Sequence, residues 1–315
     1  MNSLKRFSRS IRSWNLAALA LALGAAITAS AADVGKTFAT PEAAVAALVA
    51  AASTGDNKAF RVIFGPLAEE IENPDRAQAA NELSAFNAAV NQQQQLVRES
   101  DSKCVLEVGT NSWPFPVPIV KRNGQWFFDT AAGKDELFNR RIGRNELATL
   151  QAVRAYVEAQ REYASRDRDA DEVLEYAQKI ISTPGAKDGL FWSPDLDGEI
   201  SPLGPFAADA AAEGYKKRKS PGDEPQPFHG YFFKILTRQG QHAPGGKYDY
   251  VINRNMIGGF ALVAWPAEYG ESGIMTFIVN QQGRVYQKNL GQDTSKAAEA
   301  MKEYDPDKTW SVSPD

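Results

Sequence analysis

The stretch SWPFPVPIVKRNGQWFFDT, residues 112–130, constrains the fold more than any other part of the chain. It places Pro114, Pro116 and Pro118 at alternate positions among aromatic and β-branched residues, which favour strands. Proline has no N–H to donate, and the N–H groups of alternate strand residues point to the same edge. The pattern therefore predicts an edge strand over Trp113–Val120, whose proline edge faces away from the sheet.

An Asn-Gly pair at residues 123–124 predicts a hairpin turn that returns the chain toward Trp126. A plain two-residue turn would pair Arg122 with Gln125 and would aim the missing proline donors at the partner strand. We therefore expect a longer loop there, or a bulge. The aromatic residues of Trp113–Trp126 are expected in the core, and an exposed platform for carbohydrate or peptide is the alternative.

The first fifteen residues, MNSLKRFSRSIRSWN, carry four basic side chains and no acidic one. An apolar run of small residues follows and ends in Ala29-Ser30-Ala31. This order is typical of a secretory signal peptide, here over residues 1–31. The apolar run falls short of the ~20 residues that a membrane span needs. We therefore expect a periplasmic or secreted protein with no stable membrane span after cleavage.

The charge of the chain argues against nucleic acid as a partner. The full sequence of 315 residues has a net charge of -4, and removal of a segment with four basic and no acidic residues leaves -8. Nucleic-acid-binding domains are usually basic. The chain has a single cysteine, Cys104, so no disulfide forms within it and the core must hold the fold. Cys104 lies in a strand-like run and is expected to be buried and inert.

The mature chain is expected to hold two α+β domains, over residues 33–142 and 143–315. In the first, Thr40 and Pro41 predict the start of a helix that ends at Gly55, and further helices and an antiparallel sheet follow. Gly143 is expected to end a short helix, and Asn145 to cap a long one. The long helix would pack on an antiparallel meander with strands at Tyr231–Thr237, Gly259–Trp265, Ile274–Asn280 and Val285–Leu290.

Known catalytic motifs are missing from the sequence: it has no G-x-S-x-G, no phosphate-binding loop and no paired C-x-x-C. The only histidines, His229 and His242, lie at opposite ends of a predicted strand, so an enzyme would rest on one of them. We assign no catalytic, cofactor-binding or metal-binding residue and expect no cofactor. Two acidic groups remain as candidates for a cation: Asp195, Asp197 and Glu199 in a loop, and Asp167, Asp169 and Asp171.

The second acidic group is the weaker candidate, because Glu172 stands where a calcium loop needs glycine for its sharp turn. It is read as a solvated helix end.

Long motifs of the chain are familiar, among them WPFPVPIV, GQWFFDTAAGKDELFNRRIGRNEL, HGYFFKILTRQG and GGFALVAWPAEYGESGIMTFIVNQQGRVYQKNLG. With them the chain resembles a bacterial family of exported proteins, domain of unknown function 2950, which implies export and no established activity. The second half is also similar to the head of type IV pilin-like proteins, a long helix on an antiparallel sheet. The first half resembles cone-shaped domains of the nuclear-transport-factor-2 type, which is an analogy of fold.

The expected function is that of a non-enzymatic binding or assembly module of the cell envelope. Its partner would be an envelope protein that docks around Tyr269–Gly273. One alternative is an envelope hydrolase that uses a single histidine, His229 or His242, with a carboxylate partner. The other is a carbohydrate-binding protein.

Overall fold

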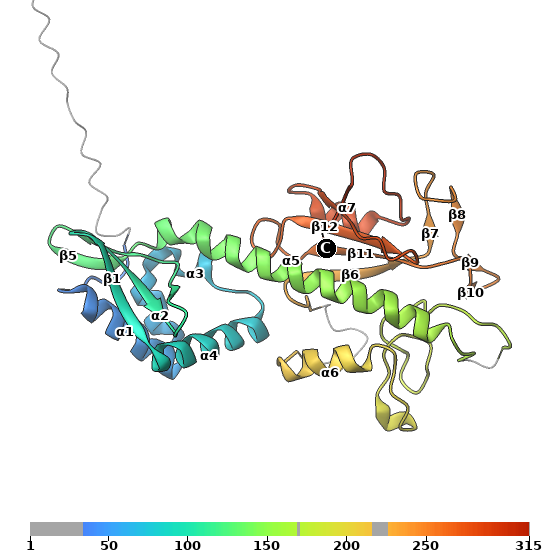
Figure 1. Ribbon diagram of the computed structural model, residues 1–315, viewed down its shortest axis with the longest axis horizontal. Coiled ribbons are helices and arrows are strands. Elements are labelled where there is room, and N and C mark those ends of the chain that lie inside the picture. The colour runs from blue at the N-terminus through green and yellow to red at the C-terminus, as the bar shows by residue number, and fades with distance from the viewer. Residues whose placement is uncertain (1–33, 169–170, 216–225, 315) are drawn as a thin grey trace, which may run out of the picture.

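Two lobes joined by one long helix make up the computed structural model, which describes residues 34–168, 171–215 and 226–314 (Figure 1). The predicted signal peptide, residues 1–31, lies outside these ranges. Within them, no helix combines the length and the apolar character that crossing a bilayer requires. Helices occur together with antiparallel sheets, which confirms the α+β class.

The N-terminal lobe packs helices against a five-stranded antiparallel sheet with the order β1-β2-β4-β5, in which β3 also pairs with β2. Thr40 caps the first helix as predicted, because its hydroxyl accepts the N–H of Ala43, and Gly55 ends that helix with φ 64°. The elements of this lobe are α1 (Pro41–Thr54), α2 (Asn57–Phe64), η2 (Gly65–Leu67), α3 (Ala68–Ile71), α4 (Arg76–Gln92), β1 (Gln94–Ser100), β2 (Lys103–Val108), β3 (Trp113–Pro114), β4 (Ile119–Arg122) and β5 (Gln125–Phe128).

The prediction of one edge strand over the proline-rich stretch is wrong. The chain forms β3 and β4 with a break at Phe115–Pro118, and β4 lies between β2 and β5. The N–H of Phe115 still donates to the carbonyl of Leu106, at 2.7 Å, before the chain bends. The break takes Pro116 and Pro118 out of the ladder, so their missing donors leave no strand partner unpaired.

The longer loop expected before Trp126 is also absent. Arg122 pairs directly with Gln125 in a two-residue turn. Asn123 and Gly124 have φ 51° and 80°, the positive values that such a turn requires. The cost that we expected does not arise, because the ladder between β4 and β5 begins only after Pro118.

Helix α5 (Thr130–Tyr163) runs without interruption for 34 residues through both lobes (Figure 1). The predicted helix break at Gly143 and the predicted cap at Asn145 are therefore wrong. A glycine costs a helix only about 1 kcal/mol relative to alanine, and α5 packs into a core at both of its ends. The division into residues 33–142 and 143–315 stays a prediction.

The C-terminal lobe is built on the predicted antiparallel meander, whose sheet has the order β14-β13-β12-β11-β6. Figure 1 shows α5 on one face of this sheet and α7 on the other. The elements of this lobe are η3 (Pro194–Leu196), α6 (Gly204–Ala212), β6 (Tyr231–Leu236), β7 (Arg238–Gln239), β8 (Tyr248–Asp249), β9 (Val251–Ile252), β10 (Asn255–Met256), β11 (Ala261–Pro266), β12 (Met275–Asn280), β13 (Tyr286–Asn289), α7 (Thr294–Ala300) and β14 (Ser311–Val312).

Each lobe has its own hydrophobic core. The core of the N-terminal lobe includes Leu48, Ile119 and Phe128, and that of the C-terminal lobe includes Val153, Phe260 and Phe277. Cys104 is fully buried in the first core, as predicted, and this burial raises the pKa of its thiol. A protonated, enclosed thiol is a poor nucleophile.

Candidate functional site

A cavity of about 1100 Å³ lies in the N-terminal lobe, between its helices and the strand break. Three helices turn the same kind of face toward it, with lining residues spaced three and four apart, as one side of a helix requires. These residues are Asn57, Phe60, Arg61 and Phe64 of α2, Arg76, Ala79, Ala80, Glu82, Leu83, Ala85, Phe86 and Ala89 of α4, and Leu137, Arg140, Arg141 and Arg144 of α5. Trp113 of β3, and Phe115 and Pro116 of the strand break, also line the cavity.

Phenylalanines form the inner wall of the cavity. Phe115 stacks on Phe64, with ring centroids 6.3 Å apart, and contacts Phe86, at 5.6 Å. Phe60 also stacks on Phe64, with ring centroids 6.3 Å apart. Phe60, Phe86 and Phe115 are only half-buried, although all three belong to the edge of the core. The lobe thus leaves part of its aromatic surface uncovered inside a concave wall.

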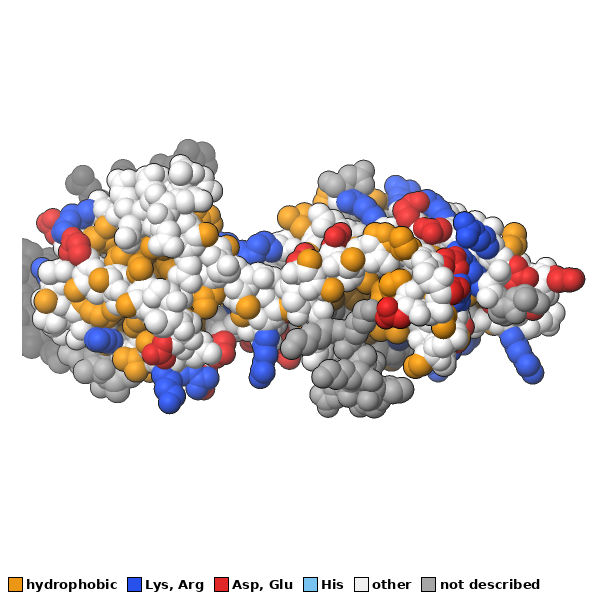
Figure 2. Space-filling view, turned by 90° about the horizontal axis from the view of Figure 1, so that it is seen from below, with side chains coloured by type: hydrophobic (Ala, Val, Ile, Leu, Met, Phe, Trp, Pro, Cys, Tyr) orange, Lys and Arg blue, Asp and Glu red, His pale blue; other side chains and the backbone are white. Residues whose placement is uncertain are grey.

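Small side chains of α4 keep this space open. Ala79, Ala80 and Ala89 occupy positions on its inner face where larger apolar residues would otherwise fill a core. The break in the proline-rich stretch brings Phe115 to the opposite wall. Figure 2 shows hydrophobic side chains at the surface of this lobe, with lysine and arginine side chains around them.

The cavity lining carries an excess of positive charge. Five arginines and two glutamates, Glu72 and Glu82, line it, which leaves three positive charges in excess in a protein that is acidic as a whole. Arg144 pairs with Glu82 at 2.5 Å, and Arg61 pairs with Glu72 at 3.4 Å. Concave walls that carry one sign of charge concentrate ions of the opposite sign.

Arg141 is the most enclosed of these arginines, with 4% of its surface exposed. Its Nη2 donates to the carbonyl of Ile71 at 2.7 Å, whereas its Nη1 has no hydrogen-bond partner among the described residues. Burial lowers the pKa of its guanidinium below the usual value. An unpaired buried donor costs free energy. An anion that accepts a hydrogen bond from Nη1 of Arg141 would remove this cost.

The expectation that Trp113 lies in the core is wrong, because this residue lines the cavity and is 37% exposed. The guanidinium of Arg140 lies 4.7 Å from its ring centre. Trp126, by contrast, is 4% exposed and belongs to the core, as expected. The two tryptophans therefore do not form a shared exposed platform. Trp113 contacts an arginine of the cavity lining, whereas Trp126 is part of the core.

The two histidines contact different carboxylates in the C-terminal lobe. The Nε2 of His229 lies 2.9 Å from Glu213, and the Nδ1 of His242 lies 2.9 Å from Asp305. The backbone N–H of His242 also donates to Asp305, at 2.7 Å, so this carboxylate fixes a turn. Neither histidine lines the cavity of the N-terminal lobe. The structure does not bring the two histidines together at one carboxylate.

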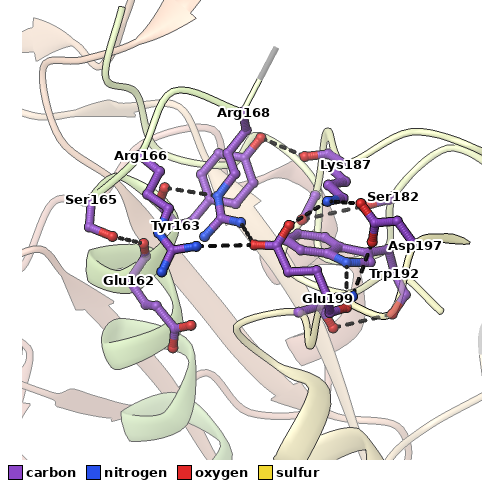
Figure 3. Close-up of polar contacts among 12 residues, drawn as sticks. Glu162, Tyr163, Ser165, Arg166, Arg168, Ser182, Lys187, Trp192, Asp197 and Glu199 are labelled. Carbon is purple, nitrogen blue, oxygen red and sulfur yellow. Dashed lines mark hydrogen bonds and ion pairs between the residues drawn. The ribbon is translucent and has the colours of Figure 1, made fainter. Parts of the chain in front are cut away.

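Two carboxylates of the candidate cation group, Asp197 and Glu199, contact basic side chains (Figure 3). Lys187 bridges both of them, and its contact with Asp197 measures 2.6 Å. Arg168 pairs with Glu199 at 2.5 Å, and its guanidinium lies over the ring of Trp192. The hydrogen bond from Lys187 lowers the pKa of Glu199. Lysine and arginine thus supply the positive charge that a cation would bring.

Other members of the two acidic groups accept hydrogen bonds from uncharged side chains or lie outside the described residues. Asp195 accepts a hydrogen bond from Ser193, at 2.7 Å. Asp171 accepts from the side chain of Asn255, at 2.7 Å, while Asp169 lies outside the described residues. Within the described ranges, no three histidine, cysteine, aspartate or glutamate side chains are grouped so that they could hold a metal ion.

Polar side chains join the lobes at the waist. Asn145 of α5 accepts from Gln78 and donates to the carbonyl of Ser272, both at 2.8 Å. Tyr215, at the end of the segment after α6, donates to Asp75 at 2.7 Å. The loop Tyr269–Gly273, which we predicted as a docking surface for a partner, is therefore held at the waist, and Ser272 is 2% exposed.

Reasoning from the sequence missed the cavity. The signals that could have found it are the three arginines in FNRRIGRNEL and the alanines on the inner face of α4. The arginine cluster was overlooked because the expected break at Gly143 separated Arg144 from Arg140 and Arg141.

Comparison with known proteins identifies the family and leaves its activity open. No curated protein matches the chain, and no solved structure does. The similarity to pilin heads and to cone-shaped domains therefore stays a resemblance. A family described as "Protein of unknown function (DUF2950)" matches residues 35–312 of the 315. The chain belongs to this DUF2950 family of unknown function.

Proposed function

We propose that the protein is exported and acts without catalysis, as a binding module that holds a small apolar ligand in the cavity of its N-terminal lobe. The observation that carries this proposal is the cavity itself, about 1100 Å³, with half-buried phenylalanines on its wall. Ligand sites are typically concave and mostly apolar, with a few polar groups that fix orientation.

The hydrolase alternative has less support from the geometry. His242 has an orienting carboxylate in Asp305, as a catalytic base would, but its other ring nitrogen lies 3.4 Å from the side chain of Gln241, which is not a nucleophile. His229 is 19% exposed in its side chain and packs against Tyr215 and Phe228. These contacts favour a structural role for both histidines.

Binding is tested with a neutral apolar probe, N-phenyl-1-naphthylamine, whose fluorescence rises in an apolar site. The mature protein should bind it saturably. Leu83→Trp places a large ring on the cavity wall and should abolish this binding. The matched control is Leu147→Trp on α5, because Leu147 is 65% exposed and does not line the cavity. Absence of saturable binding, or equal loss in both folded variants, would refute the proposal.

Export is tested separately, because it rests on the sequence before residue 32. Protein recovered from the cell envelope should begin near Ala32 or Asp33 when its N-terminus is sequenced. Intact Met1 on a protein confined to the cytoplasm would contradict it.

A further inference from the structure

We propose that the ligand of this cavity is a single-chain amphiphile with one anionic headgroup, a carboxylate or a phosphate. The inference rests on the proposed function, and it adds the chemical class of the ligand. The apolar chain would lie against the phenylalanine wall, and the anionic end would meet the arginines of α5. Two observations suggest this arrangement: Phe60, Phe64, Phe86 and Phe115 contact one another in the lining, and three of the five lining arginines lie on α5.

The apolar part of the ligand is indicated by the inner wall. Phe60, Phe86 and Phe115 keep part of their surface uncovered, and covering apolar surface contributes about 25 cal/mol per Å². The wall is built mainly of phenylalanine, leucine and alanine side chains. A flexible hydrocarbon chain fits such a wall better than a sugar, which needs hydrogen-bond partners along its length.

The anionic part is indicated by Arg141. Its guanidinium is almost fully enclosed, and Nη1 has no partner among the described residues. Arginine presents its N–H groups as a planar fork that matches carboxylate and phosphate oxygens. An anion paired with Arg141 would satisfy a donor that the protein itself leaves unsatisfied.

Other arginines of the cavity lining also favour an anionic ligand. The side chain of Arg76 on α4 makes no hydrogen bond or ion pair with the described residues, and it also lines the cavity. Arg140 and Arg144 lie one helical turn apart on α5, beside Arg141. Glu136, the partner of Arg140, does not line the cavity, whereas Glu82, the partner of Arg144, does. Even with Glu72 and Glu82 counted, the five arginines leave three positive charges in excess. The positive charge in excess therefore remains available to a ligand.

The test compares ligands that differ only at the headgroup. Decanoate, decyl phosphate and 1-decanol are titrated into the mature protein by calorimetry, below their micellar concentrations. At least one of the two anions should bind about tenfold to a hundredfold more tightly than the alcohol, as expected for a charge-assisted pair in an enclosed site. The two anions also show whether a fatty acid or a phosphate headgroup is preferred.

Variants assign that preference to Arg141. Arg141→Met should remove most of the difference between anion and alcohol, whereas Arg141→Lys should keep part of it. Arg161→Met is the matched control, because Arg161 lies on the same helix, pairs with Glu158 and does not line the cavity. Should Arg141→Met fail to fold, Arg76→Met replaces it, with a smaller loss expected. High salt should weaken binding of the anions and leave that of the alcohol unchanged.

The outcomes separate the two proposals. If the anions and the alcohol bind equally well, or if Arg161→Met has the same effect as Arg141→Met, the anionic class is wrong while the cavity stays a binding site. If none of the three ligands binds and the neutral probe does not bind either, both proposals are wrong.

Discussion

The C-terminal lobe has a fully buried central strand, whereas the N-terminal lobe has half-buried phenylalanines that line a cavity. In the C-terminal lobe all six residues of β11 are buried, and Phe260 and Phe277 are at most 1% exposed. In the N-terminal lobe, Phe86 and Phe115 stay half-buried beside a cavity of about 1100 Å³. Protein cores are normally close-packed. The cavity in the N-terminal lobe therefore leaves room for a ligand.

The largest expected effect comes from truncating one phenylalanine in each lobe. Phe277→Ala should lower the free energy of unfolding by about 3–5 kcal/mol, because it leaves a hole in a filled core. Phe86→Ala should lower it by about 1 kcal/mol, because Phe86 is half-exposed and loses mainly its contact with Phe115. Chemical denaturation of both variants measures the two costs. Equal costs would mean that the cavity wall is packed like a core.

Two glycines of α5 offer the next comparison. A Cβ at Gly133 would lie 2.7 Å from the Cα of Val117, so Gly133→Ala should destabilise the N-terminal lobe by about 1–3 kcal/mol. A Cβ at Gly143 would meet no atom within 4 Å, so Gly143→Ala should stabilise the protein by about 0.5–1 kcal/mol. Thermal unfolding of both variants tests this. A loss of stability in Gly143→Ala would show that α5 needs to bend there.

These glycines also show what the sequence could and could not predict. Strands, caps and turns follow local rules, and Thr40, Pro41 and Gly55 placed the first helix correctly. Gly143 misled us, because the packing of α5 at both ends outweighs a local propensity. The alternate prolines led us to predict an edge strand, but a proline can also be accommodated where a strand is interrupted. The cavity is lined by residues from three helices and a strand break. These segments are far apart in the sequence, so no local pattern could predict that they line one cavity.

A smaller effect concerns acid. Asp197 and Glu199 are tied to Lys187, which lowers the pKa of Glu199. A lowered folded pKa contributes stability above the unfolded value, about 4.3 for glutamate, and that contribution is lost as the pH falls through the folded pKa. Glu199→Gln should therefore destabilise the protein at pH 7, by an amount that shrinks as the pH falls from 7 to 3. A difference that is constant over this range would contradict the role of the charge.

The smallest effect is expected at the histidines. His229→Ala and His242→Ala change side chains of the C-terminal lobe, outside the cavity. Ligand affinity should stay within about twofold of the wild type, as for distant independent sites. Calorimetry with decanoate measures this, and complementation of a deletion strain gives the biological readout. Loss of function in a stable histidine variant would favour the hydrolase hypothesis.

A crystal structure of the protein with 12-bromododecanoic acid would show whether the N-terminal lobe binds its ligand in the cavity. The anomalous signal of bromine should appear among Phe60, Phe86 and Phe115, with the carboxylate at Arg141. A cavity closed by movement of α4 onto the strand break, or bromine found only on the outer surface, would contradict the proposed site.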